Sequence, residues 1–213
     1  MNILIVGANG KIARQLIKIL AEEKDYHITA MIRKEEQAAE LKELGADETI
    51  VSNLEGDISS VFEAQEAVVF AAGSGGHTGA DKTILIDLWG ARKAVDAAKE
   101  HGARRFLMVG SMRSSNPDEG PDSMKHYFVA KKLADEYLQH SGLNYTIVRP
   151  GRLTDHTPSG KVRIAPALGE LGEVTRTDIA EVLARSIKAE TTFFKAFDVI
   201  DGDIDIEKAV QSM

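Results

Sequence analysis

The sequence predicts an α/β fold in which a doubly wound parallel sheet forms a single domain. Short apolar runs bounded by Gly, Asp, Asn or Pro alternate with helical patterns along almost the whole chain, as expected for repeated βα units. A glycine-rich turn at residues 7–10 joins the first apolar run, residues 3–6, to a helix with apolar residues at helical spacing. No linker or internal repeat divides the 213 residues, so we expect one domain spanning residues 1–213.

The pattern predicts strands and helices in alternation. Gly45 and Gly102 follow two of the helices at the position where a left-handed residue ends a helix. Residues 151–175 lie beside the substrate in this reading, and the Gly- and Pro-rich stretch 151–173 is expected to form a loop with at most a short strand at 162–164. We expect strands at residues 2–6, 28–32, 48–51, 67–70, 105–109, 145–148 and 197–200, and helices at 11–23, 35–44, 82–101, 124–139 and 177–188.

Composition excludes several classes of protein. The chain has no cysteine, which excludes disulfides, thiolate zinc sites and cysteine nucleophiles, and its six histidines lack the spacing of a metal site. A net charge of −7 argues against nonspecific binding of nucleic acid. No apolar run reaches the roughly 18 residues of a membrane span, and the first strand begins too early to leave room for a signal peptide. We therefore expect a cytoplasmic protein that binds neither membrane nor nucleic acid.

The turn at residues 7–10 has the composition of a phosphate-binding turn. Gly7 permits a tight turn, Gly10 lets the backbone approach a pyrophosphate, and the small Ala13 lets the following helix pack close to the strand. The helix N-terminus adds unpaired N–H groups and the positive end of the helix dipole. The turn predicts dinucleotide binding, although the same glycines could simply close a tight corner. The expected contacts here are Gly7, Asn9, Gly10, Lys11 and Ile12.

The end of the second strand carries the basic pair Arg33-Lys34. Sites that prefer NAD place a carboxylate near this point to accept hydrogen bonds from the ribose 2′-hydroxyl. Here two cations stand instead, and arginine offers a planar fork that suits a phosphate. The following acids, Glu35 and Glu36, fall in the first turn of the next helix. The pair predicts a preference for NADP(H), with a solvated charge cluster as the alternative.

The ends of the third and fourth strands carry small and amide residues. Asn53 and Leu54 could contact an adenine through one hydrogen bond and one apolar face, or form a plain turn. The run 71–76 could let the backbone pass beside a ribose and nicotinamide, or form a mobile loop without a ligand. The residues of this run that we expect at the cofactor are Ala71, Ala72 and Gly73.

The candidate catalytic group is a tyrosine and a lysine on one helical face. Tyr127 and Lys131 are four residues apart, so they lie one helical turn from each other. The lysine ammonium would stabilise a phenolate and lower the phenol's pKa, so that Tyr127 could exchange a proton with a carbonyl or alcohol oxygen during hydride transfer. Ser111, at the end of the fifth strand, could hydrogen-bond the same oxygen, with Ser114 as a substitute. A half-buried tyrosine beside a surface lysine is the alternative.

Seven segments together resemble the short-chain dehydrogenase/reductase superfamily, specifically its atypical NAD(P)-binding members of the epimerase/dehydratase-like or NmrA-like kind. They span most of the chain in the order of that family. The segments are GANGKIA at 7–13, MIRK at 31–34, SNL at 52–54, FAAGSG at 70–75, FLMVGS at 106–111, YFVAK at 127–131 and YTIVRPGRL at 145–153.

The resemblance implies an NAD(P)-binding Rossmann fold with Ser111, Tyr127 and Lys131 as the catalytic set. Asn53 stands where the family often has aspartate, Gly110-Ser111 replaces a common Ser-Ser, and the relay asparagine of many members has no counterpart. Only 63 residues follow Pro150, and sugar-nucleotide epimerases of this superfamily usually carry a larger carboxyl-terminal substrate domain, so that substrate class is not expected. The expected partner is another small-molecule substrate. The resemblance also implies that the nicotinamide end of the pocket is lined by Pro150, Gly151 and Leu153.

Three functions follow as hypotheses. The first is an NADPH-dependent oxidoreductase that transfers hydride to a small carbonyl, quinone or flavin-like acceptor. The second is an NmrA-like redox sensor that binds NADP, although such sensors tend to lack the tyrosine that is present here as Tyr127. The third, disfavoured by length, is a nicotinamide-dependent epimerase or dehydratase. Fold analogy does not choose among them, and the oligomeric state stays open.

Overall fold

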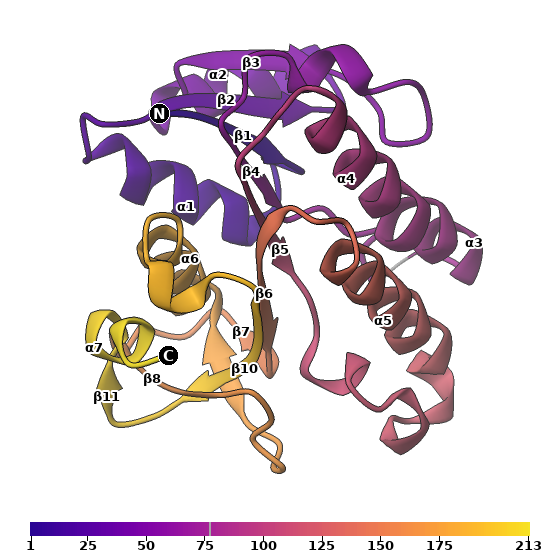
Figure 1. Ribbon diagram of the computed structural model, residues 1–213, viewed down its shortest axis with the longest axis vertical. Coiled ribbons are helices and arrows are strands. Elements are labelled where there is room, and N and C mark those ends of the chain that lie inside the picture. Colours follow the sequence, from indigo (N-terminus) through magenta and orange to yellow (C-terminus); the bar gives the residue numbers. More distant parts are fainter. Residues whose placement is uncertain (77) are drawn as a thin grey trace.

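The computed structural model describes residues 1–76 and 78–213, and a nine-stranded sheet runs through its centre (Figure 1). The strand order is β11-β8-β10-β6-β5-β4-β1-β2-β3. At one end β8 (Lys161–Ala165) runs antiparallel to β10, and β11 (Ile204–Asp205) runs antiparallel to β8. The parallel strands are β1 (Asn2–Val6), β2 (His27–Ile32), β3 (Glu48–Val51), β4 (Ala67–Phe70), β5 (Arg105–Val109), β6 (Asn144–Pro150) and β10 (Lys195–Asp201).

The strand order reverses beside β1. From β1 the chain adds β2 and then β3 on one side, and it then returns to add β4, β5 and β6 on the other side. The loops that leave the carboxyl ends of β1 and β4 therefore diverge, and they open a crevice where ligands bind in this class of sheet. The predicted doubly wound parallel fold is confirmed, with an antiparallel addition at one edge.

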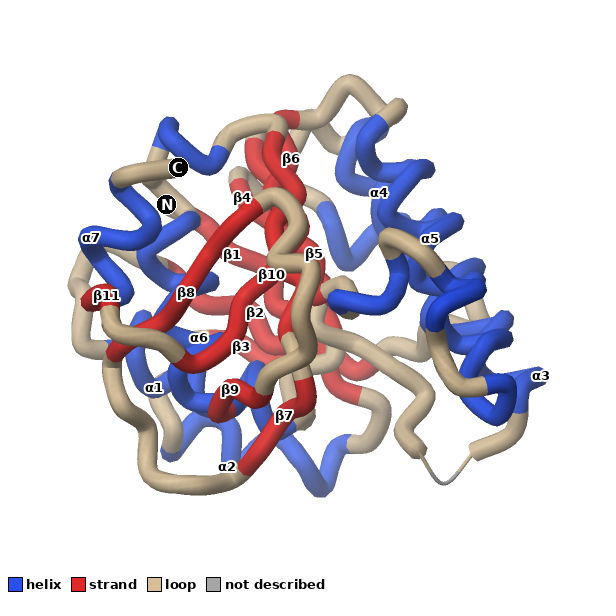
Figure 2. Tube along the Cα trace, turned by 90° about the horizontal axis from the view of Figure 1, so that it is seen from below, coloured by secondary structure: helices blue, strands red, loops and turns tan. Residues whose placement is uncertain are grey.

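Helices cover both faces of the sheet (Figures 1 and 2). Side chains of β1 alternate between the two layers, with Ile3 and Ile5 in one core and Leu4 and Val6 in the other. Both faces are buried, which is why the strands are continuous apolar runs. One face carries α1 (Lys11–Ala21), α2 (Ala38–Glu43), α6 (Arg176–Ser186) and α7 (Ile206–Gln211), and the other carries α3 (Ala80–Lys82), α4 (Ala91–Glu100) and α5 (Lys125–Gln139).

The predicted helix at 82–101 is not a single α-helix. It starts two residues earlier with α3, continues as a π-helix over Thr83–Gly90, and ends as α4. A π-helix has a wider turn than the 3.6-residue period used to recognise helices, so the sequence pattern misses it. The segment buries the carboxylate of Asp87, which is 1% exposed, and such segments are frequent at functional sites.

The expectation of a loop over residues 151–175 is wrong. This region contains β7 (Arg152–Thr154) and β9 (Glu173–Thr175), which pair in parallel as a separate two-stranded sheet, and β8 between them joins the main sheet. Three-residue strands are too short to show a two-residue periodicity, and only the predicted strand at 162–164 is confirmed, as β8. The seven parallel strands of the main sheet agree with the predicted ranges to within two residues at each end, whereas β11 was not predicted.

The described ranges, 1–76 and 78–213, contain neither a membrane-spanning helix nor a metal-binding cluster. None of their helices is both long enough and apolar enough to cross a bilayer. Their His, Asp and Glu side chains form no group of three or more that could hold a metal ion.

Candidate active site

The glycine turn at the end of β1 is shaped by close backbone approach. Gly7 has a φ of +79°, and a Cβ atom there would lie 2.6 Å from the Cα of Ala72. Gly10 has an ordinary φ of −70°, but a Cβ there would lie 3.1 Å from the carbonyl oxygen of Gly7. The two glycines therefore let the turn lie tight against the loop after β4, and they form a cradle at the N-terminus of α1 that opens into a pocket. This cradle fits the pyrophosphate of a dinucleotide.

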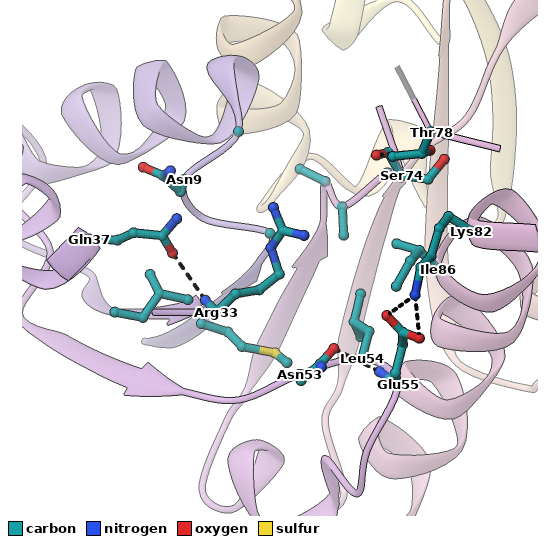
Figure 3. Close-up of a pocket in the computed structure, with 17 residues that line it drawn as sticks. Asn9, Arg33, Gln37, Asn53, Leu54, Glu55, Ser74, Thr78, Lys82 and Ile86 are labelled. Atoms are coloured by element: carbon teal, nitrogen blue, oxygen red, sulfur yellow. Dashed lines mark hydrogen bonds and ion pairs between the residues drawn. The ribbon is translucent and has the colours of Figure 1, made fainter. Parts of the chain in front are cut away.

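A pocket of about 430 Å³ extends from this turn along the carboxyl ends of β2 and β3 (Figure 3). Arg33 extends into it, while its backbone N–H donates to the side chain of Gln37 at 3.1 Å. Across the pocket, Lys82 of α3 pairs with Glu55 at 2.8 Å. The predicted cofactor residues that line the pocket are Gly7, Asn9, Gly10, Arg33, Asn53, Leu54, Ala71, Ala72 and Gly73.

Two predicted cofactor contacts, Lys11 and Lys34, do not line either cavity described here. The Lys11 ammonium pairs with Asp155 at 2.6 Å, and Arg176 donates to the same carboxylate at 2.7 Å. Lys34 is exposed at the start of the turn 35–37, and its backbone N–H donates to Gln37. Both lysines are near the turn in sequence. However, the side chain of Lys11 pairs with Asp155, and Lys34 is exposed to solvent.

A second cavity, of about 1080 Å³, continues from the first past Ala71, Ala72 and Gly73. It brings Ser111, Tyr127 and Lys131 together, from the end of β5 and from one face of α5. Ser114 lies outside this lining, because its buried hydroxyl oxygen lies within hydrogen-bond distance of Asp135, at 3.0 Å, and of the carbonyl oxygen of Ser111, at 2.6 Å. Other predicted cofactor residues that line this cavity are Ile12, Pro150, Gly151 and Leu153.

The pKa of the Tyr127 phenol is raised above its ordinary value, whereas the sequence predicted a net lowering. Burial is the main cause, because it disfavours the charged phenolate. Lys131 and a hydrogen bond with Ser111 lower the pKa, as expected, but the negative charges of Asp87 and Asp135 raise it. The phenol is therefore protonated at neutral pH, the state in which it can donate a proton.

Asp87 is a cavity residue that the sequence analysis missed. Its carboxylate accepts a hydrogen bond from the backbone N–H of Ser74 at 2.9 Å, which ties the π-helix to the small-residue loop after β4. A Cβ at Gly73 would lie 3.1 Å from the other carboxylate oxygen. A single aspartate inside a helical pattern carries no signal in the sequence. The position of Asp87 on the cavity wall follows from the π-helical conformation of residues 83–90, which the sequence pattern does not predict.

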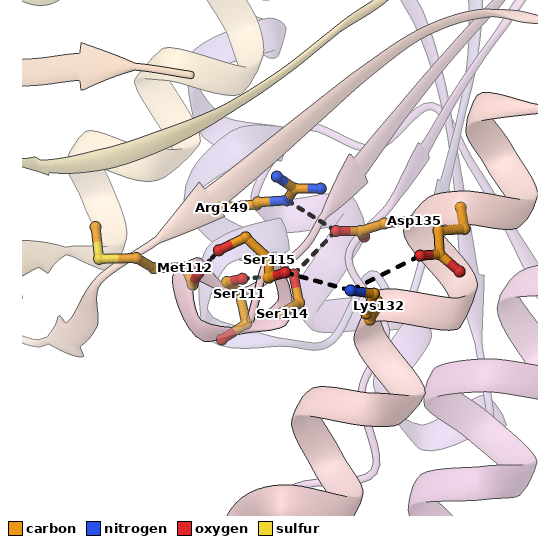
Figure 4. A network of polar contacts seen from close by, with 8 residues as sticks. Ser111, Met112, Ser114, Ser115, Lys132, Asp135 and Arg149 are labelled. Carbon is orange, nitrogen blue, oxygen red and sulfur yellow. Dashed lines mark hydrogen bonds and ion pairs between the residues drawn. The ribbon is translucent and has the colours of Figure 1, made fainter. Parts of the chain in front are cut away.

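A polar network joins α5 to the ends of β5 and β6 through Ser114, Asp135 and Arg149 (Figure 4). Asp135, one turn after Lys131, accepts hydrogen bonds from Ser114 and from the Nε of Arg149 at 2.9 Å. Burial raises the pKa of Asp135, while Arg149 and Lys131 act in the opposite direction. Arg149 in β6 lies beside Asp198 in β10, whose carboxylate accepts the backbone N–H of Leu168 at 3.1 Å. These contacts fix the helix that carries Tyr127 and Lys131.

The comparisons with known proteins agree with this geometry. A family model described as NAD(P)H-binding matches residues 7–190. The uncharacterized sugar epimerase YhfK of Bacillus subtilis is 41% identical over the full length of both chains. A solved structure from Bacillus halodurans, assigned as an NAD-dependent epimerase/dehydratase, is 50% identical with a TM-score of 0.97, and each chain is fully covered.

A more distant solved structure carries a different description. The oxidoreductase ylbE of Lactococcus lactis is 28% identical, with a TM-score of 0.89 over 100% of this chain and 96% of that one. Both structures confirm the predicted single-domain Rossmann fold over the length compared. The family match also confirms a nicotinamide dinucleotide as the cofactor class. This chain belongs to the NAD(P)H-binding family of the epimerase/dehydratase-like, atypical short-chain dehydrogenase/reductase kind.

Proposed function

We propose that the protein is an NADPH-dependent oxidoreductase that reduces a small carbonyl, quinone or flavin-like acceptor. The observation that carries the proposal is the meeting of Ser111, Tyr127 and Lys131 on the wall of a cavity that continues from the glycine turn. A sensor needs only the residues that bind the dinucleotide, whereas a reductase also needs a proton donor such as Tyr127 beside the nicotinamide end of the cavity. The oxidoreductase assignment of the relative from Lactococcus lactis also supports this reading.

The preference for NADPH rests on Arg33. Its guanidinium enters the pocket, and no carboxylate pairs with it among the described residues. An arginine fork suits a 2′-phosphate, and the missing carboxylate removes the group that would repel it. Glu55 is the acid of this pocket, and Lys82 neutralises it.

In this proposal, different residues bind the dinucleotide and transfer the proton. Gly7 and Gly10 would hold the pyrophosphate of the dinucleotide, whose reduced nicotinamide supplies the hydride. Ser111 donates a hydrogen bond to the acceptor oxygen and orients it. Tyr127 gives its proton to this oxygen as it gains negative charge, and the ammonium of Lys131 stabilises the phenolate that remains. The phenolate then regains a proton from solvent.

Removal of the phenol hydroxyl tests the proposal. In the Tyr127→Phe variant we expect nearly unchanged NADPH affinity and a fall of about 10²-fold or more in NADPH oxidation with accepted aldehydes or ketones. Tyr137→Phe is the matched control, because Tyr137 lies on the same helix but bonds Asp96 outside the cavity. The measurement is a screen of NADPH oxidation against aldehydes, ketones, quinones and flavins.

Each outcome of this screen assigns the function. Equal turnover by the native and Tyr127→Phe proteins with every acceptor would remove Tyr127 from catalysis. Tight NADPH binding without turnover of any acceptor would favour the sensor. Reduced quinones and flavins can take their proton from water, so a loss of turnover that is confined to aldehydes and ketones still agrees with the proposal.

A further inference from the structure

The far side of the second cavity, beyond the catalytic group, is largely apolar but contains one arginine with a distinct environment. Met112, Met124, Phe128 and Leu171 line it, and Leu171 is 65% exposed at its mouth. Arg113 lies among them, two residues after Ser111 and half-buried. A cation beside thioether and aromatic side chains costs solvation free energy unless a partner compensates for it.

The other arginines and the lysine of this cavity already have partners or a task. Arg152 pairs with Glu173, Arg176 pairs with Asp155 at 2.7 Å, and Lys131 belongs to the catalytic group. Among residues 1–76 and 78–213, no carboxylate pairs with Arg113. Its only hydrogen bond to these residues runs from Nη1 to the backbone carbonyl of Glu119, at 2.9 Å. The rest of its donor fork is therefore available to a ligand.

The segment that holds Arg113 is itself fixed. The nearest acid, Glu119, is engaged elsewhere, because its carboxylate accepts a hydrogen bond from the side chain of Asn116 at 2.7 Å. The next residue, Gly120, packs so close to Phe128 that a Cβ there would lie 2.6 Å from the ring. The carbonyl that orients the guanidinium is thus anchored to α5, the helix that carries Tyr127. A preorganised donor loses less entropy on binding.

We propose that Arg113 recognises a carboxylate on the substrate, so that the acceptor is an apolar carbonyl compound with one carboxylate group. This inference rests on the proposed function for the site and names its substrate class. A planar guanidinium matches a carboxylate in two parallel hydrogen bonds. Arg113 offers one such fork, which matches one carboxylate group. The apolar side chains would cover the body of the substrate.

The test compares a carboxylate with its neutral analogue in a binding experiment. Naphthoate and methyl naphthoate are titrated by calorimetry into the protein, with and without saturating NADP⁺. We expect naphthoate to bind about 10- to 100-fold more tightly than its ester, the range for hydrogen bonds to a charged group. In Arg113→Met this preference should disappear while the affinity for the ester is unchanged. Arg104→Met is the control, since Arg104 is exposed at the opposite end of β5.

The outcomes separate this inference from the proposed function. Equal affinity for naphthoate and its ester, or a preference that survives Arg113→Met, would overturn the inference. NADPH oxidation with formylbenzoate and with its methyl ester is then measured. Turnover of both compounds at equal efficiency would retain the oxidoreductase and contradict the carboxylate site. Selective binding of naphthoate, without turnover of either compound or of any acceptor in the screen described above, would retain the site and contradict the oxidoreductase.

Discussion

At the residue scale, Tyr127 lies between charges of opposite sign. Lys131 lowers the pKa of its phenol, while Asp87 and Asp135 raise it, and burial decides the net upward shift. The raised pKa keeps the phenol protonated at neutral pH, and Lys131 offsets part of the upward shift by stabilising the phenolate. The sequence spacing predicted the effect of Lys131. The effect of the two aspartates was not predicted, and that of Asp87 depends on how the π-helix packs against α5.

The charge of Asp87 provides a prediction about pH. In Asp87→Asn the amide oxygen can still accept the Ser74 N–H, but the negative charge near the phenol is lost. We expect the pKa of Tyr127 to fall, so the loss of activity at high pH should begin at a lower pH than in the native protein. The pH profile of kcat/KM with an accepted ketone measures this shift. An unchanged or higher upper limit would show that Asp87 does not act on Tyr127 through its charge.

Single residues also show where sequence reasoning fails. Lys11 and Lys34 have the charge and sequence position of phosphate ligands, yet Lys11 pairs with Asp155 and Lys34 faces solvent. The partner of a long flexible side chain depends on the tertiary structure and not on local sequence. Asp155, the partner of Lys11, is 144 residues away in sequence. Glycines are more predictable, because their backbone requirements are local, as Gly7, Gly45 and Gly102 show by their positive φ.

At the scale of one element, the turn from β1 to α1 contains two glycines, and each position requires glycine for a different physical reason. Gly7 needs a left-handed conformation and direct contact with Ala72, so a side chain there would disturb the fold. Gly10 has an ordinary conformation, and its missing side chain leaves room for the ligand. The two positions should therefore respond differently to substitution.

We expect Gly10→Val to abolish NADPH binding while the protein stays folded. The branched side chain would occupy the space needed by the pyrophosphate, and its Cβ would lie 3.1 Å from the backbone oxygen of Gly7, so the turn has to shift by only a few tenths of an ångström for the variant to fold. Calorimetric titration with NADPH measures binding, and circular dichroism monitors the fold. Gly7→Ala is the comparison, because we expect it to lose thermal stability. Micromolar NADPH affinity in a folded Gly10→Val variant would place the cofactor elsewhere.

The sequence predicted long and regular helices and strands better than short or irregular ones. Strands β1, β4 and β5 have the predicted bounds because each is a buried and mostly apolar run. The edge strand β3 also has the predicted bounds, although its side chains are exposed or only partly buried. The short strands β7, β9 and β11 depend on pairing with distant segments, and α7 has only six residues, so local sequence does not reveal them. The π-helix was also not predicted from local sequence, and for that reason the position of Asp87 was missed.

At the scale of the whole molecule, the cleft follows from the topology of the sheet. The divergence of loops on either side of β1 depends only on strand order, which the alternation of βα units predicts. The substrate side is different, since its walls come from the turn region 112–124 and from both ends of the 151–175 region. Their arrangement depends on tertiary contacts such as those of Gly120 with Phe128.

A thermal prediction tests the single domain. A ligand at about 100-fold its Kd stabilises the folded state by roughly 2.7 kcal/mol, which for a chain of this size corresponds to a rise in Tm of about 5–10 °C. We expect one cooperative transition that shifts as a whole when NADPH is added, as measured by differential scanning calorimetry. Two transitions, of which only one responds to NADPH, would show that the chain contains a second folding unit.

The central claim is that the cleft along the carboxyl ends of the sheet binds NADPH through the glycine turn and Arg33. Paired fluorescence titrations of NADPH and NADH, on the native protein and on Arg33→Ala, test it most directly. We predict tighter binding of NADPH by the native protein. In Arg33→Ala, NADPH affinity should fall by roughly 10- to 100-fold, the equivalent of one charge-assisted contact, while NADH affinity barely changes. Equal titration curves for the two cofactors on the native protein would contradict the account.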